Sequence, residues 1–461
     1  MGNAESVNDV YDSGMADSLT RRTDRNRRLA IQQWDRKCLH GYQCERLNEL
    51  LSVILPENRF YASKLTGLGS SMSSMSSMSS IDQLDSLPYT TKSELNGLIA
   101  TAVAAEPTPV ENDYARNLTW PIDRYCRFHR TSGTQGRPMV VLDTADDWQW
   151  WMEGWQFVLD AVELTEADRV VMAFSFGPFI GFWSAFDAAK ERGSLVAPTG
   201  AMSSIARLEL IFSIDATVVF CTPSYALHLI ELAEQQKLDL RKSSVRSIVV
   251  AGEPGGSIPE VRDRIEHGFD AKVIDHSGAT EVGPWGFADK NRTGIHVNEA
   301  QFIAEFRSIE TDQPAGEGEL SELILTTLGR TGCPVIRYRT GDLVRPSWKH
   351  ESDNRFVLLE GGVLGRTDDM MIIRGVNVFP TSIEQILRGF PEVDEFRMTA
   401  FRESAMDQLK IEVEDRANDP KRIAEALQSR LGLRVKVTSV ESGSLPRFEA
   451  KGKRFIDRRE V

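Results

Sequence analysis

Two glycine-rich segments of the chain combine residue types that could hold phosphate groups. Residues 131–138 read TSGTQGRP, and residues 275–284 read DHSGATEVGP. In the first segment two glycines let backbone N–H groups turn inward, and Arg137 adds a fixed positive charge. In the second segment Glu281 could hold Mg²⁺ against phosphate oxygens. Each segment also fits an ordinary solvated turn, so neither decides a function alone.

A third segment, YRTGDLV at residues 338–344, carries a carboxylate in a tight turn. Asp342 could accept two hydrogen bonds from vicinal hydroxyl groups, as a ribose presents them. It also fits an Asx-type turn with a solvated carboxylate. Two further segments are GRTDDMMIIRGVNVFP at residues 365–380 and LPRFEAKGKRFIDRR at residues 445–459. A basic run such as the last one is usually a solvated face.

The middle of the chain predicts a scaffold of alternating strands and helices for these segments. Short apolar runs predict strands at residues 170–174, 217–220, 247–250 and 272–274. Helices are expected at residues 225–236 and 259–267, and from Thr144, an N-cap with Asp147 three residues on. This alternation predicts an α/β fold with mixed or parallel sheets. Thr280 and Glu281 would then follow a strand, at the edge where such folds bind ligands.

Apolar spacing predicts which helical residues are buried. A stripe on the helix after Thr144 predicts core packing for Trp148, Trp151, Met152, Trp155, Val158 and Leu159. Near the N-terminus a helical pattern predicts burial of Leu29, Ile31, Trp34, Leu47, Leu50, Leu51 and Ile54.

The two ends of the chain differ from the middle. Residues 1–27 are polar and charged, and we expect a disordered tail. The Ser/Met-rich residues 70–80 predict a flexible loop. After residue 365 we expect a strand at 371–373, a helix at 381–387, strands at 395–400 and 409–413, a helix at 420–431 and a strand at 435–440. This order predicts a small ferredoxin-like α+β domain at residues 366–461, after a large domain at residues 28–365.

Composition excludes several classes of protein. The 461 residues carry a formal net charge of −13, which disfavours nucleic-acid binding as the main role. Five cysteines without CxxC spacing indicate free thiols in a reducing compartment. No apolar run approaches the ~20 residues of a membrane span. We therefore expect a cytoplasmic protein that does not bind a membrane.

Each segment is weak alone, but their identity, order and spacing together are specific. They resemble the adenylate-forming superfamily of acyl- and aryl-CoA ligases, luciferases and peptide-synthetase adenylation domains. The chain is most similar to the branch of phenylacetate–CoA ligase. That branch is supported by CTPSYA at residues 221–226, AGEPGG at 251–256 and RFYASKL…LPYTTKSELN at 59–96. The resemblance spans residues 28–461.

The resemblance implies an architecture and a reaction. The architecture is a large multi-sheet α/β domain followed by a small C-terminal lid that rotates on a hinge. The reaction is the ATP-dependent adenylation of a carboxylic acid, aryl or arylacetic, with release of pyrophosphate and transfer of the acyl group to coenzyme A. ATP, Mg²⁺ and coenzyme A are then required, and the assembly is left open, with a homodimer among the options. Two alternatives remain: an amine, hydroxyl or carrier-protein thiol as acceptor, or a homologue that binds nucleotide with little turnover.

The resemblance also assigns roles to residues of the large domain. It places Thr280 at the α-phosphate, Glu281 at Mg²⁺ and Asp342 at the ribose. The loop around the β- and γ-phosphates is implied to comprise Thr131, Ser132, Gly133, Thr134, Gly136 and Arg137. The adenine pocket is implied to be lined by Gly252, Glu253, Pro254 and Ser277. Ser277 stands where the family has an aromatic residue, and the adjacent His276 is a candidate substitute.

Further roles fall on the lid. Arg366 is implied to lie near the ribose and phosphates, Asp368 at the hinge and Gly375 beside the pantetheine tunnel. Lys451 takes the place of a catalytic lysine, with Lys453 as second choice because Ala450 replaces the family's glycine. A mobile ammonium group suits the bridging of a carboxylate oxygen and an α-phosphate oxygen as charge builds up.

One region of the chain departs from the family pattern, and another leaves the identity of the acid undecided. Residues 285–299 contain no cysteine and only His296, so no structural zinc is expected there. His276 and His296 are expected to be hydrogen-bonded loop residues. An aromatic cluster could either stack an aryl acid or form core beneath the sheet: Phe174, Phe176, Phe179, Phe182 and Trp183.

Overall fold

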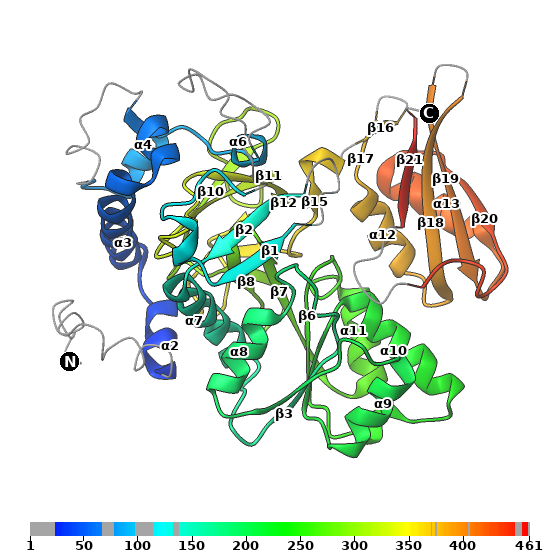
Figure 1. The fold of residues 1–461 in the computed structure, drawn as a ribbon. Coiled ribbons are helices and arrows are strands. Elements are labelled where there is room, and N and C mark those ends of the chain that lie inside the picture. Colours follow the sequence, from blue (N-terminus) through cyan, green and yellow to red (C-terminus); the bar gives the residue numbers. More distant parts are fainter. Residues whose placement is uncertain are drawn as a thin grey trace.

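A mixed sheet of nine described strands forms the centre of the large domain (Figure 1). The computed structural model describes residues 24–66, 78–96, 114–131, 138–369, 371–373, 376–403, 406–447 and 454–459. The parallel half of the sheet has the order β4–β3–β5–β6–β7, with bounds β3 Arg169–Met172, β4 Leu195–Pro198, β5 Val218–Cys221, β6 Ser247–Val250 and β7 Lys272–Ala279. The antiparallel half continues through β8 Gly283–Phe287, β9 Gly294–Val297, β14 Leu358–Glu360 and β13 Pro346–Ser347.

Helices cover both faces of the parallel half. One face packs against α7 Ala145–Ala161 and α8 Trp183–Glu191, and the other against α9 Ser204–Ser213, α10 Pro223–Gln235 and α11 Pro259–Phe269. Alternate strand residues point to opposite faces, so Val170 joins the first core and Val171 the second. Burial on both faces explains why these strands read as continuous Val/Ile runs.

Helix α7 follows the prediction from the sequence closely. Thr144 caps it, and Asp147 closes the capping box. All six residues of the predicted stripe are buried. The predicted strands and helices of this region are also found, although β7 runs to Ala279, five residues beyond the predicted end, because its second half pairs with β8.

A second sheet and a hairpin complete the large domain. The antiparallel sheet comprises β10 Phe302–Ser308, β11 Ser321–Thr327, β12 Tyr338–Val344 and β15 Gly365–Arg366. The hairpin comprises β1 Arg127–Arg130 and β2 Val140–Asp143. Short helical segments are η3 Ile122–Arg124 and η4 Leu240–Lys242.

The N-terminal part is helical and differs in detail from the expectation. Its elements are α2 Arg25–Gln32, α3 Arg36–Glu57, α4 Arg59–Thr66, η2 Ile81–Ser86 and α6 Lys92–Leu95. Residues 25–27, expected in the tail, are helical, and the rest of the tail up to residue 23 lies outside the described residues. Leu29 is 39% exposed and not buried as predicted. Of the Ser/Met-rich loop only residues 78–80 are described, and Met78 is buried.

The C-terminal part forms a smaller α+β unit beside α10 and α11 (Figure 1). It contains η5 Thr367–Asp369, β16 Met371–Ile373, β17 Val376–Val378, α12 Pro380–Arg388, β18 Val393–Glu403, β19 Met406–Asp415, α13 Pro420–Leu431, β20 Lys436–Ser439 and β21 Phe455–Arg458. The predicted first strand pairs only with β17, and the sheet has the order β20–β19–β18–β21. The fourth strand of this sheet is thus residues 455–458, which pair in parallel with β18, and not residues 371–373, the first strand of the predicted domain. In the described parts of the chain, no helix combines the length and apolarity that a membrane crossing requires.

Candidate active site

Glu281 lies just beyond the carboxyl end of β7, in a turn that begins at Thr280. Its side chain is 12% exposed, and its Oε1 accepts a hydrogen bond from the Tyr338 hydroxyl at 3.0 Å. The Lys92 Nζ lies 3.3 Å from the same oxygen. Burial favours the protonated carboxyl, but the charge of Lys92 and these hydrogen bonds outweigh it and lower the pKa of Glu281. Glu281 is therefore held in its ionised form, the form in which a carboxylate could hold Mg²⁺.

Asp342 and Arg366 are paired across strands β12 and β15. The Arg366 Nη1 donates to the Asp342 Oδ1 at 2.9 Å, and the Arg366 Nε donates to the Asp368 Oδ1 at 2.9 Å. Burial disfavours the cation, yet the two carboxylates raise the pKa of Arg366. Tyr338 lies on the same strand as Asp342, and the charges of Glu281, Arg366 and Asp342 all act on its hydroxyl. The predicted ribose and magnesium residues thus share one neighbourhood.

Gly341 gives Asp342 its position. Residues 340–342 of β12 oppose only Leu323 of β11, so the strand bulges there. Gly341 has a φ of +76°, and a Cβ atom on it would lie 3.0 Å from the Arg366 Nη2. Only glycine fits this conformation beside that guanidinium group without strain.

Arg330 holds the turn at Thr280 and Glu281 through its backbone carbonyls, and this role was not identified from the sequence. Its fully buried guanidinium donates to the carbonyl oxygens of Glu281 at 2.9 Å and Thr280 at 3.4 Å. Its Nε donates to the Asp143 Oδ1 at 2.8 Å, and Trp151 stacks 5.3 Å away. Arg330 follows a Leu-Gly pair and belongs to no recognisable motif, so the sequence did not indicate its role. Lys92 lies in the segment at residues 59–96 that supported the resemblance, but no role was assigned to it.

The phosphate loop of the prediction connects the two strands of the β1–β2 hairpin. Thr131 is buried, and its backbone N–H and its hydroxyl both bond to Met139, the N–H donating to the carbonyl at 3.0 Å and the hydroxyl accepting from the amide at 3.0 Å. Other predicted residues lie outside the described residues: Ser132, Gly133, Thr134, Gly136, Arg137, Gly375, Lys451 and Lys453.

The loop after β6 contains Gly252, Glu253 and Pro254, and it faces the C-terminal unit. The Glu253 Oε1 accepts from the Ser224 amide at 2.7 Å, and its Oε2 lies 3.8 Å from the Arg454 Nη1. Arg454 is 6% exposed and also pairs with Glu395 at 2.6 Å and Glu384 at 4.0 Å. Arg447 and Glu231 form a second contact across the two units at 3.7 Å.

Neither histidine near the second segment is available to a ligand. His276 is 5% exposed, its Nδ1 lies 2.8 Å from the Gly286 carbonyl oxygen, and Trp155 packs 4.1 Å from its ring. Burial lowers the pKa of His276 to about 3. Because strand neighbours point to opposite faces, Ser277 is directed away from this core, and His276 cannot replace the missing aromatic residue. Both His276 and His296 are hydrogen bonded, in strands β7 and β9 rather than loops.

The aromatic cluster divides between core and cavity. Phe182 is 2% exposed and packs on Trp155 and Phe220, so it is core. Phe176 and Trp183 instead line a hollow of about 500 Å³ together with Phe186. Pro198, the last residue of β4, and Gly200, just beyond its carboxyl end, also line the hollow. The hollow therefore opens at the same edge of the sheet as Thr280 and Glu281.

The segment between β3 and α8, which contributes Phe176 to the hollow, also contacts the β1–β2 hairpin. The Arg130 amide donates to the Pro178 carbonyl at 2.5 Å. Phe174 and Phe179 pack edge to face between the hollow and the core. The hollow and the hairpin are thus fixed relative to each other.

Comparisons with known proteins identify the family of this chain. The family model described as AMP-binding enzyme matches residues 84–302, and the one described as AMP-binding enzyme C-terminal domain matches residues 375–459. A phenylacetate–coenzyme A ligase of Escherichia coli (strain K12) is 31% identical over 74% of this chain and 80% of its own length. A phenylacetate–coenzyme A ligase of Thermus thermophilus is 28% identical over 93% of this chain and 99% of its own.

Solved structures extend the likeness to the arrangement of the two units. 2-Hydroxyisobutyryl-CoA ligase in its postadenylation state, bound to 2-HIB-AMP, superimposes with a TM-score of 0.81 at 26% identity, over 98% of this chain and 95% of that one. The same ligase in its thioesterification state gives 0.67 over the same coverage.

The two family models and the curated relatives define this chain as an enzyme that binds AMP and activates carboxylic acids. The chain belongs to the adenylate-forming family of AMP-binding enzymes, in the branch of the phenylacetate–coenzyme A ligases. It is an AMP-forming acid–thiol ligase that joins an acid to coenzyme A through an acyl-adenylate.

Proposed function

We propose that the acid is aryl or arylacetic and that its ring enters the hollow beside Phe176 and Trp183. One observation carries this choice: the hollow is lined by three aromatic side chains and opens at the edge of the sheet where Glu281 lies. Its volume of about 500 Å³ is in the range of small-molecule pockets, ~300–1,000 Å³. Aromatic walls favour a flat aromatic substrate through edge-to-face packing.

The same proposal assigns the nucleotide. Asp342 accepts from the ribose hydroxyls, Arg366 donates a hydrogen bond to Asp342, and the loop at residues 252–254 borders the adenine. Thr280 and Glu281 meet the α-phosphate from one side, and the loop between β1 and β2 meets the β- and γ-phosphates. The contact between Arg130 and Pro178 brings the acid and phosphate segments together.

The reaction then needs two anions to approach each other. A carboxylate oxygen bonds to the α-phosphorus as the bond to the bridging β-phosphate oxygen breaks, and pyrophosphate leaves. Mg²⁺ at Glu281 supplies charge neutralisation at the phosphate oxygens. Lys451 of the lid contacts the carboxylate and the α-phosphate. In the second step the thiolate of coenzyme A attacks the acyl carbonyl and AMP leaves.

Two domains divide this work in the proposal, at residues 28–365 and 366–461, with the hinge at Asp368. The first step needs Lys451, whereas the second needs an open path for the thiol. A lid rotation presents each set of groups in turn. The TM-score is higher with the postadenylation state than with the thioesterification state, which supports assigning the orientation in this structure to the first step.

Pyrophosphate exchange tests the proposal. Arylacetic and benzoic acids should support exchange at least tenfold better than aliphatic acids of equal size, and Phe176→Ala should reduce that preference. Lys451→Ala should lose exchange but still convert supplied acyl-adenylate with coenzyme A, while Lys349→Ala, at an exposed lysine, serves as control. Loss of exchange in Lys453→Ala alone would move the catalytic role to Lys453. Equal exchange with all acids would contradict the aryl assignment.

The alternative of a different acceptor is tested in the same assay. If coenzyme A is the acceptor, its addition consumes the adenylate and yields a thioester. An adenylate that persists with coenzyme A but is consumed by an amine, an alcohol or a carrier-protein thiol would favour the alternative.

A further inference from the structure

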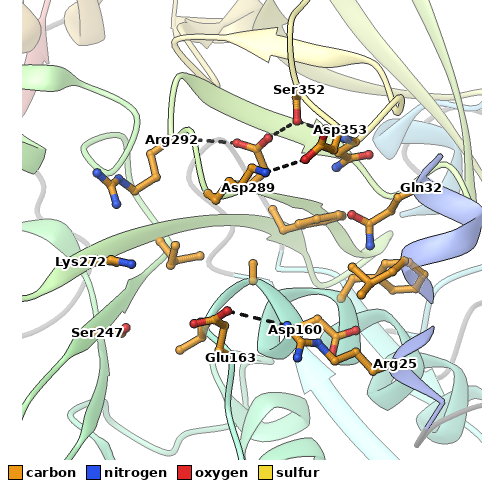
Figure 2. Close-up of a pocket in the computed structure, with 18 of the residues that line it drawn as sticks. Arg25, Gln32, Asp160, Glu163, Ser247, Lys272, Asp289, Arg292, Ser352 and Asp353 are labelled. Carbon is orange, nitrogen blue, oxygen red and sulfur yellow. Dashed lines mark hydrogen bonds and ion pairs between the residues drawn. The ribbon is translucent and has the colours of Figure 1, made fainter. Parts of the chain in front are cut away.

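A second cavity lies at the edge of the nine-stranded sheet opposite to the candidate active site. It is bordered by Ser247 and Lys272, where strands β6 and β7 begin, and helix α2 forms one wall (Figure 2). Its volume is about 530 Å³. Strand β7 has eight residues, which at ~3.3 Å per residue separate its two ends by roughly 23 Å. The cavity is therefore distinct from the site around Glu281.

The floor of this cavity is apolar. It is formed by side chains of the main core that are 2–4% exposed: Phe157, Val162, Ile274 and Phe287. Leu29 of α2 adds an apolar wall, and its 39% exposure contradicted the burial predicted from the sequence. A solvent-accessible leucine beside buried rings offers a surface for an apolar ligand body.

The polar atoms around the cavity that lack partners are all donors. The Asn354 side chain is 6% exposed, and its Oδ1 accepts from the Phe356 amide, but its Nδ2 has no hydrogen-bond partner among the described residues. The Arg292 Nε forms an ion pair with the Glu266 Oε1 at 3.4 Å but no hydrogen bond within the described parts of the chain. Lys272 is exposed and shows no ion pair with any described side chain.

Three of the four carboxylates around the cavity are already engaged, and the fourth, that of Glu163, is 71% exposed and lies 3.9 Å from the Arg25 Nη2. Asp160 is 3% exposed in its side chain and pairs with Arg28 and Arg192. Asp289 accepts from the Ser352 hydroxyl and from two backbone amides. Asp353 pairs with Lys290 at 2.6 Å. The buried Asn354 Nδ2 therefore lacks an acceptor, and an anionic one would also compensate Lys272.

We propose that this cavity binds a small organic anion, a carboxylate carried on an aromatic or branched aliphatic body. Figure 2 shows Lys272 and Arg292 on one side of the cavity and Gln32 and Arg25 of α2 on the other. The carboxylate accepts from Lys272, with Arg292 and Asn354 as further donors. The apolar body lies on the floor of Phe157, Ile274 and Phe287, where burial of its surface contributes most of the affinity.

Fluorescence titration with 8-anilinonaphthalene-1-sulfonate, an aryl anion, tests the site. Lys272→Glu reverses one exposed charge and should weaken the affinity of the bound probe at least tenfold. The matched control Lys436→Glu, at an exposed lysine of the C-terminal unit, should leave it unchanged. Leu29→Asp should weaken binding to a similar degree, because it places a negative charge on the apolar wall.

Two further measurements identify the class of ligand and isolate the site. In the wild type, 1-naphthoate should displace the probe from the site whose affinity Lys272→Glu weakens. The cation 1-naphthylmethylamine should not displace it. Ligase activity should remain at the wild-type level in Lys272→Glu, because the site is remote from the reaction. Equal probe affinity in the wild type and Lys272→Glu, or displacement by the amine, would overturn the proposal.

Discussion

Arg330 and Asp143 form a buried ion pair that joins the two segments for which we propose phosphate binding. Their closest atoms, Arg330 Nη2 and Asp143 Oδ1, lie 2.6 Å apart, with side-chain exposures of 0% and 1%. Asp143 ends strand β2 of the hairpin that carries the phosphate loop, while Arg330 holds the carbonyl oxygens of Thr280 and Glu281. One guanidinium group therefore sets the position of the turn relative to the hairpin.

Replacement of this arginine should impair catalysis beyond its effect on stability. Arg330→Lys keeps the charge but cannot reach Asp143 and both carbonyls, so pyrophosphate exchange should fall about 100-fold, as misplacement by ~1 Å can cause. Breaking the buried pair should also destabilise the fold by about 3–5 kcal/mol. Arg207→Lys, at another fully buried arginine on the far side of the sheet, is the control for stability alone. Equal exchange in both variants would contradict a positioning role.

Lys92 should control the protonation of Glu281. Burial favours the protonated carboxyl, but Lys92 lowers the pKa of Glu281, so its removal must raise that pKa. In Lys92→Met the acid limb of the pH profile of kcat/KM for ATP should therefore move to higher pH. Tyr338→Phe, which removes a neutral donor, should move it in the same direction but less. A limb that stays in place in Lys92→Met would show that Glu281 does not titrate in the rate-determining complex.

Asp275 should make stability depend on pH. Burial raises the pKa of Asp275 to about 7, although the Ser257 hydroxyl donates to it at 2.6 Å. The folded state then binds a proton that the unfolded state releases near pH ~3.9. Stability should therefore fall as pH rises from about 4 to about 7, by up to ~1.4 kcal/mol per pH unit.

Asp275→Asn should remove this component of the pH dependence. Urea unfolding of wild type and variant at several pH values measures the free energy of unfolding. As pH rises toward neutral, this free energy should increase for the variant relative to the wild type. The absence of such a shift would mean that Asp275 has the same pKa in both states.

The contact between Glu253 and Arg454 should stabilise the lid in the described orientation. Glu253→Gln keeps the acceptor for the Ser224 amide but removes the charge that faces Arg454 at 3.8 Å. Adenylation should slow several-fold, whereas conversion of supplied adenylate with coenzyme A should not, because only the first step uses this orientation. Single-turnover kinetics of the two half-reactions measure the effect. Equal slowing of both half-reactions would indicate a general defect in the nucleotide pocket.

Periodicity and local capping made much of the fold predictable. The Thr144–Asp147 capping box and the Trp stripe specified α7, and continuous Val runs specified the parallel strands. The pairing of residues 371–373 was not predictable, because a three-residue strand carries no information about its partner. Leu29 was assigned to the core because its helix was read without the cavity beside it.

The sequence indicated candidate residues that would contact a ligand directly, whose roles stay predictions, and it did not indicate a residue that acts through another one. Glu281 and Asp342 followed from their segments, and the structure brings their neighbourhoods together through Tyr338. Arg330 acts only on backbone carbonyls, so its role depends on a contact between distant segments. The burial of His276 depended on Trp155, which lies more than a hundred residues earlier in the chain.

The pairing of β15 with β12 limits how the lid can travel. Arg366 is held in a ladder of the large domain, and Met371 is already buried in the core of the lid. The four residues between them, 367–370, let the two Cα atoms separate by at most ~17 Å when the segment is fully extended. Such a short linker keeps the C-terminal segment at an effective concentration on the order of millimolar near the nucleotide. A severed lid supplied at micromolar concentration should therefore restore little of the rate.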